Sequence, residues 1–191
     1  MGEDAVDAFD SNPKSPPRGF DPFNDRPSRT VRNRLSESLR LCIAGREVYR
    51  DAPPELVQQF SQPSCAAYIK DRVERYRLAT RAIRATSEGP LTQAAILWHH
   101  GLYFEAHEIL EPHWLAVAGR EREGLKGLIQ AIGVDVHREA GHAAAAAGLA
   151  RKAVERLRRF GDAISDKQAI NIEHLVTRLT CLINSARQED A

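Results

Sequence analysis

The apolar positions of this chain recur mainly at spacings of three and four residues, which is the period of one face of an α-helix. The period is clearest over residues 28–45, 63–86, 123–139 and 166–188. No stretch alternates apolar and polar residues for long, as a half-buried strand would. The pattern therefore predicts an all-α protein, an antiparallel helical bundle of about six to eight helices without a sheet.

Glycine and proline divide this pattern and mark where the central helices begin and end. Pro90 suits the first turn of one helix, and Gly101 ends it before the helix that carries residues 104–114. Gly141 separates the next helix from an alanine-rich one over residues 143–160. The helices on either side of Gly101, and those on either side of Gly141, thus form two central helical hairpins.

The composition changes along the chain and predicts four segments. Residues 1–27 hold five of the ten prolines, which is typical of a disordered tail. Phe20 is one of three phenylalanines through which this tail would alternatively dock on the folded part. Residues 28–89 are predicted to form an N-terminal helical extension, residues 90–162 a core helical domain, and residues 163–191 a C-terminal packing helix.

The charge, the apolar runs and the cysteines bound the environment and the partners of the protein. The net charge is +1, so no overall field attracts nucleic acid, and no nucleic-acid partner is expected. No apolar run approaches the length of a membrane span, and the acidic, proline-rich start lacks the order of a secretion signal. Cys42, Cys65 and Cys181 are scattered, which is typical of free thiols in a reducing compartment. We therefore expect a cytoplasmic protein without a membrane partner, and the oligomeric state is left open.

The densest group of chemically capable side chains lies in residues 104–114, with the sequence FEAHEILEPHW. On a helix, His107, Glu111 and Trp114 fall at positions i, i+4 and i+7 and share one face, with Glu108 at its edge. Burying ionised groups beside aromatic rings is costly unless each group has a partner. The pattern therefore indicates a polar cluster with a purpose on this helix.

These residues resemble a small bacterial and archaeal helical domain known as Domain of Unknown Function family 309. The resemblance rests on two blocks in the same order. The first runs from Gly101 through FEAHE to Trp114, and the second is KGLIQ at residues 126–130 followed by His137. It covers about residues 92–160. The resemblance implies an all-helical domain and no established activity.

One interpretation of the cluster is a metal site. His107 and Glu111 would be ligands one helical turn apart and His137 a third, with Glu105 or Glu108 as an auxiliary ligand or as the catalytic general base. Mixed histidine and carboxylate ligands on bundle helices suit zinc, iron or manganese. The protein would then be a metal-dependent enzyme of the hydrolase type. The string HEILE differs from the protease pattern H-E-x-x-H in its last residue, so protease chemistry does not follow.

A second interpretation is a metal-free pocket for a small polar or cationic ligand or a protein partner. Tyr103 and Trp114 would frame this pocket, with Lys126 and Gln130 opposite. A third is a structural network in which the same histidines bridge buried carboxylates. The residues favour a small-ligand or protein-binding module with a buried His/Glu cluster, and a metal-dependent enzyme is the alternative. Whether the protein is an enzyme, and which cofactor it would use, is left open at this point.

Overall fold

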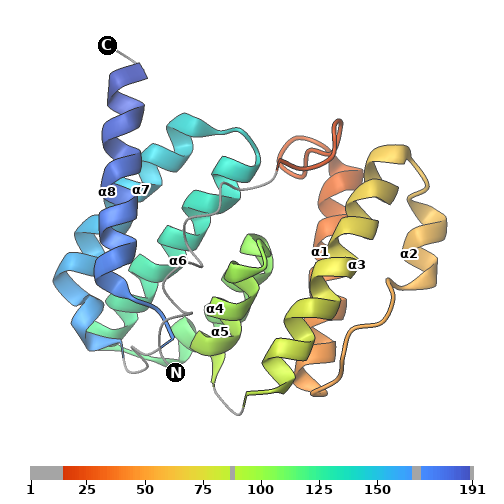
Figure 1. The fold of residues 1–191 in the computed structure, drawn as a ribbon, viewed down its shortest axis with the longest axis horizontal. Helices are drawn as coiled ribbons and strands as arrows, with labels where there is room; N and C mark the ends of the chain where they lie inside the picture. Colours follow the sequence, from red (N-terminus) through yellow and green to blue (C-terminus); the bar gives the residue numbers. More distant parts are fainter. Residues whose placement is uncertain (1–14, 87–88, 165–168, 190–191) are drawn as a thin grey trace. The chain divides into compact units, whose positions relative to one another are not determined.

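The computed structural model describes residues 15–86, 89–164 and 169–189. All regular elements in this part of the chain are helices (Figure 1). The described residues form eight α-helices and one short 3₁₀-helix without a strand, which confirms the predicted all-α fold. In chain order the elements are α1 (Arg26–Ala44), α2 (Pro54–Gln59), α3 (Pro63–Arg84), α4 (Pro90–His99), α5 (Tyr103–Ala116), α6 (Gly119–Glu139), α7 (Ala143–Phe160), η2 (Gly161–Ala163) and α8 (Ile172–Glu189).

The described helices form two compact units. The N-terminal unit contains α1 to α3 together with the turn His100–Leu102, and the C-terminal unit contains α4 to α8. The turn belongs to the N-terminal unit because the buried Arg72 of α3 donates a hydrogen bond of 2.9 Å to the carbonyl of Gly101. Residues 1–14 of the predicted tail and residues 165–168 before the last helix lie outside the described residues.

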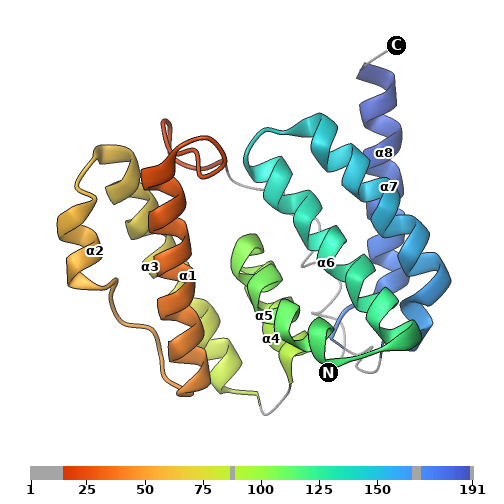
Figure 2. The same ribbon diagram turned by 180° about the vertical axis from the view of Figure 1, so that it is seen from behind.

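The N-terminal unit is built on the apolar faces of α1 and α3, which lie side by side in both views (Figures 1 and 2). On α1, Val31, Leu35 and Leu39 are at most 1% exposed, as their spacing predicted. Ile43 completes this stripe, whereas Cys42 beside it is half-buried. Helix α3 contributes a second apolar face that consists of Cys65, Tyr68, Ile69, Val73, Tyr76 and Ile83.

Helix α1 begins at Arg26, before the segment 28–45 in which the sequence shows the helical period, and Asp25 is its N-cap residue. The Asp25 carboxylate accepts a hydrogen bond of 2.8 Å from the Ser28 backbone N–H and another from the Ser28 hydroxyl. The side-chain hydrogen bond, followed by the backbone one, lowers the pKa of Asp25. Aspartate caps a helix as well as serine does, and its charge complements the helix dipole.

Part of the segment predicted as a tail, residues 15–25, contacts the N-terminal unit closely. Phe20 is 3% exposed, and its ring stacks on Tyr68 of α3 with centroids 3.7 Å apart and planes 10° apart. Burying an aromatic ring in this way removes a large apolar surface from water. At Phe20 the structure therefore agrees with the alternative in which the tail docks.

The C-terminal unit contains the two predicted hairpins. Helices α4 and α5 form the first hairpin and α6 and α7 the second, while α5 packs on α6 and α8 packs on α7 (Figure 2). The apolar faces of these helices make one core. Among its fully buried side chains are Leu97, Leu110, Leu125, Leu128, Ile132, Leu175 and Leu179.

Two helices of this unit have other starting points than the sequence predicted. Helix α6 begins at Gly119 and not at residue 123, and Glu121 lies in its first turn, where a negative charge complements the helix dipole. Helix α8 begins at Ile172, because residues 169–171 are not helical, and the predicted start at residue 166 lies outside the described residues. The Asn171 side chain accepts a hydrogen bond of 3.0 Å from the backbone N–H of His174 and so caps this first turn.

Helices α6 and α7 approach each other closely because small residues line their contact. A Cβ atom added at Gly127 would lie 3.0 Å from the Cβ of Arg156. Gly124 is tighter still, because an added Cβ would lie 2.6 Å from the carbonyl oxygen of Phe160. The alanines of α7 that are at most 4% exposed are Ala146, Ala147, Ala150 and Ala153.

A buried charged network joins α4, α6 and α8. Asp135 is 2% exposed, and its carboxylate accepts a hydrogen bond of 2.8 Å from the indole N–H of Trp98. Both terminal nitrogens of Arg178 donate to the same carboxylate at 3.1 and 3.0 Å, and Arg138 donates at 3.3 Å. The sequence reasoning missed this network, although an aspartate between Val134 and Val136 in an apolar run was a usable signal.

Candidate functional site

The helix that carries the FEAHE motif, α5, is anchored by one buried face. It begins at Tyr103, shortly after Gly101, whose φ of 67° is the left-handed conformation that glycine adopts most easily. Tyr103, Ala106 and Leu110 recur at helical spacing and are at most 4% exposed. Glu105 is also buried, at 1% exposed. This face fixes α5 in the unit and leaves the next face of the helix for the remaining polar residues of the motif.

Three polar residues of α5 bring their side chains close together: His107, Glu108 and Glu111. We call them the donor cluster. Each offers one atom of a kind that can bind a metal, and these three atoms lie within 4.8 Å of one another. His107 and Glu108 are half-buried, so the cluster lies beside the core and not inside it. Among the described residues this is the group of His, Cys, Asp and Glu side chains whose spacing suits one ion.

Two ring nitrogens on α5 are buried without a hydrogen-bond partner among the residues that the structure describes. They are Nδ1 of His107 and Nε1 of Trp114. The His107 Nδ1 atom lies 3.6 Å from a carboxylate oxygen of Glu108, which is too far for a hydrogen bond. Leaving a buried polar atom unsatisfied costs about 1–3 kcal/mol. Such atoms are rare in folded proteins and often mark the place of an ion, a water molecule or a ligand.

Trp114, predicted to frame a ligand pocket, already has a cation on its ring. The Arg122 guanidinium of α6 lies 4.9 Å from the centroid of the indole ring, within the range of a cation–π contact. The indole N–H can only donate a hydrogen bond. Trp114 is therefore suited to donate to an oxygen of a bound molecule rather than to hold a cationic ligand on this side.

Two of the predicted site residues of α6, Gln130 and His137, contact residues outside the donor cluster. The Gln130 side-chain oxygen accepts a hydrogen bond of 3.2 Å from Arg156 of α7. His137 lies beside His142, with ring centroids 5.8 Å apart, and it is not among the donors that gather around one point on α5. Burial, and then the nearby His142, lowers the pKa of His137. Lys126 is half-buried and makes no ion pair with a described residue.

Comparison with known proteins concerns the same segment. Residues 91–149 match the model of a family described as a domain of unknown function, DUF309. The match runs from α4 into α7, includes the donor cluster, and confirms the resemblance seen in the sequence. No curated protein and no solved structure matches the chain. None of the described helices has the length and the apolar character that crossing a bilayer requires.

Proposed function

We propose that the DUF309 segment of this chain binds a divalent metal ion through His107, Glu108 and Glu111 and uses the ion to hold a small ligand. The observation that carries the proposal is the convergence of three donor atoms within 4.8 Å on one helix. A histidine and a glutamate one turn apart are common on helix surfaces. A third donor, together with a buried imidazole nitrogen that no described residue satisfies, supports a site that an ion completes.

The donor set supports a choice of metals. One imidazole and two carboxylates suit zinc, iron or manganese, which are the ions that the sequence pattern indicated. In the proposal Glu108 takes the position that the sequence analysis gave to His137. Three protein donors leave coordination positions for water or for a ligand. The ligand would carry an oxygen acceptor, because the N–H of Trp114 on the same helix has no acceptor among the described residues.

A metal-dependent hydrolase is the alternative to a binding role. It would place a water molecule on an open coordination position, where the ion lowers the pKa of that water. A general base beside it would then be needed. Glu105 is 1% exposed, and Glu108 is itself a proposed ligand, so neither is well suited to act as a free base. The arrangement therefore favours ligand binding over hydrolysis.

Changing His107 to alanine is expected to weaken the binding of Mn²⁺ or Zn²⁺ by more than about 100-fold. Mutating residues that merely support a metal ligand already costs about 10–100-fold. The measurement is isothermal titration calorimetry of each ion into chelator-treated full-length protein, together with elemental analysis of protein purified without chelator. The matched control is His113→Ala, which removes an imidazole of the same helix outside the donor cluster and is expected to leave the affinity unchanged.

Thermal unfolding gives a second measure of the same site. A metal at 100 times its dissociation constant stabilises the folded state by about 2.7 kcal/mol. Wild type and His113→Ala are expected to show this gain, and His107→Ala and Glu111→Gln are expected to lose it. Equal binding by wild type and His107→Ala, or no stoichiometric ion in the wild type under metal-rich expression, would contradict the proposal.

A further inference from the structure

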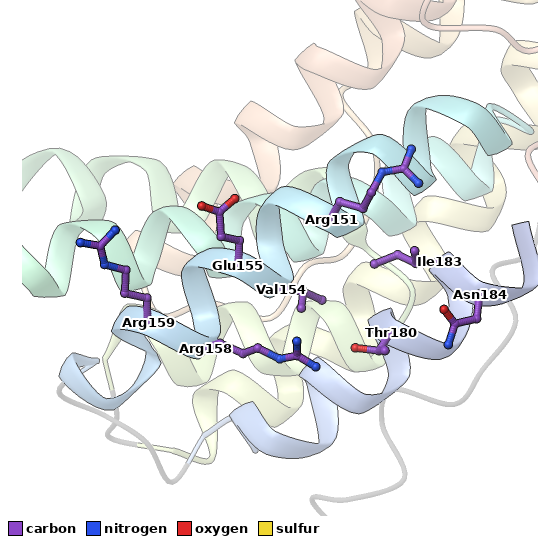
Figure 3. A pocket seen from close by; sticks show the side chains of 8 residues that line it. All are labelled: Arg151, Val154, Glu155, Arg158, Arg159, Thr180, Ile183 and Asn184. Atoms are coloured by element: carbon purple, nitrogen blue, oxygen red, sulfur yellow. The ribbon is translucent and has the colours of Figure 1, made fainter. Parts of the chain in front are cut away.

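The C-terminal unit carries a groove of about 630 Å³ between α7 and α8, which shares no residue with the donor cluster (Figure 3). Its floor is apolar and consists of Val154 of α7 and Ile183 of α8, each 8% exposed. The groove is open to solvent along most of its extent, so a ligand would lie along it rather than be enclosed. A groove of this kind accommodates the apolar part of a small ligand.

The lining of the groove carries an excess of positive charge. Three of its residues, Arg151, Arg158 and Arg159, are arginines from α7, and Glu155 is its one acidic residue. No ion pair joins Glu155 to any of these arginines. Because the chain as a whole has a net charge of +1, this excess is a local feature and not a consequence of a basic protein.

Two of these arginines have their donors available. Within the part of the chain that the structure describes, Arg151 and Arg158 make neither an ion pair nor a side-chain hydrogen bond. Elsewhere in the same unit arginines are engaged, as in the 3.1 Å contact of Arg156 with Glu123. The guanidinium groups at the groove therefore have donors to offer to a ligand, and guanidinium forks match phosphate oxygens with two parallel hydrogen bonds.

Side chains of both helices line the groove. Figure 3 shows Arg158 reaching from α7 toward Thr180 of α8. The Thr180 hydroxyl already donates to the carbonyl of Val176 at 2.7 Å, so it is free to accept but not to donate. The Asn184 amide has no hydrogen bond with a described residue and offers a further donor. Arg158 and Asn184 thus come from different helices, and a bound anion would link them.

We infer that this groove binds a small phosphate-bearing molecule. Arg158 and Arg151 hold the phosphate oxygens, Asn184 adds a hydrogen bond, and the apolar part of the ligand rests on Val154 and Ile183. The inference goes beyond the proposed metal site and uses other residues, so either one stands or fails without the other. An arginine pair over an apolar floor favours a ligand with both a multiply charged anion and a flat or apolar group.

The test is a titration of full-length, isotope-labelled protein with ATP in the presence of EDTA, followed by heteronuclear NMR. EDTA keeps the donor cluster free of metal, so a metal-bound nucleotide cannot produce the signal. Shifts are expected in residues 151–159 and 180–184 and not in residues 107–111. Inorganic pyrophosphate is expected to shift the arginine signals more weakly than ATP does, and adenosine, which lacks phosphate, is expected to leave them unchanged.

The matched variants are Arg158→Ala and Lys152→Ala. Both remove one positive charge from α7, but Lys152 does not line the groove. Arg158→Ala is expected to lower the affinity for ATP about tenfold, the usual size of a charge-assisted hydrogen bond, and Lys152→Ala less than about twofold. Arg151→Ala serves as a second variant on an exposed position.

Three results would overturn the inference. One is the absence of shifts with millimolar ATP and pyrophosphate. Another is an equal loss of affinity in Lys152→Ala and Arg158→Ala, which would indicate attraction by diffuse charge. The third is a set of shifts confined to residues 107–111, which would place the phosphate at the donor cluster.

Discussion

Replacing Asp135 by alanine is expected to lower the free energy of unfolding by about 3–5 kcal/mol, the usual cost of breaking a buried ion pair. The change removes the carboxylate that accepts hydrogen bonds from both terminal nitrogens of Arg178, whose side chain is 12% exposed. It also removes the acceptor of the Trp98 indole N–H. For a chain of this size such a loss lowers the melting temperature by roughly 6–20 °C. Urea unfolding followed by circular dichroism measures it.

Two further variants separate the buried network from charge in general. Asp162→Asn breaks the 3.0 Å ion pair between Asp162 and Arg120, whose side chains are 68% and 61% exposed respectively. This change is expected to alter the free energy of unfolding by less than about 1 kcal/mol. Asp135→Asn keeps the shape of the side chain but loses its charge, and an intermediate loss is expected. If Asp135→Ala were as mild as Asp162→Asn, the network would not be what joins α4, α6 and α8.

Replacing Gly124 by alanine is expected to destabilise the protein by about 1–3 kcal/mol, the usual cost of overpacking. The new Cβ would lie 2.6 Å from the carbonyl oxygen of Phe160 and 2.9 Å from a side-chain carbon of Ile164. The first contact is with backbone, so the α6 and α7 backbones would have to separate. Alanine is better than glycine in a helix by about 1 kcal/mol, which offsets only part of this cost.

Gly148→Ala is the matched control for this prediction. Gly148 lies inside α7, and an added Cβ would meet nothing within 4 Å. The same substitution is therefore expected to raise the free energy of unfolding by about 0.4–1 kcal/mol, through the lower entropy of the unfolded chain. Opposite signs in the two melting curves are the expected result. A gain in stability at both glycines would show that α6 does not approach Phe160 as closely as described.

The donor cluster was predictable in part because its members belong to one helix. The spacing of His107, Glu108 and Glu111 along the chain fixes their spacing on α5 once the helix forms. Helical periodicity is a local property that a sequence shows directly. The contribution of His137 was a different kind of prediction, because it required the relative placement of α5 and α6. The structure places His137 beside His142 instead of in the cluster.

The network around Asp135 and the groove beside Arg158 could not be predicted from the spacing of residues along the chain. Asp135 meets Trp98 and Arg178 across sequence separations of 37 and 43 residues, so no local spacing announces the contact. Arg158 and Asn184 become neighbours of one groove because α8 packs on α7. A charged side chain on a helix looks the same in the sequence whether it faces water, a buried partner or a groove.

The sequence by itself determined the helical class, the two central hairpins and the placement of His107 and Glu111 on one helix face with Glu108 at its edge, because all three follow from periodicity and from glycines between neighbouring helices. Tertiary structure alone decided that Glu105 is buried while the donor cluster stays at the edge of the core. It also decided which helix pairs build the charged network and the basic groove. These features depend on how each helix is rotated about its axis and how closely it approaches its neighbours. The packing of side chains from distant segments determines both the rotation and the distance.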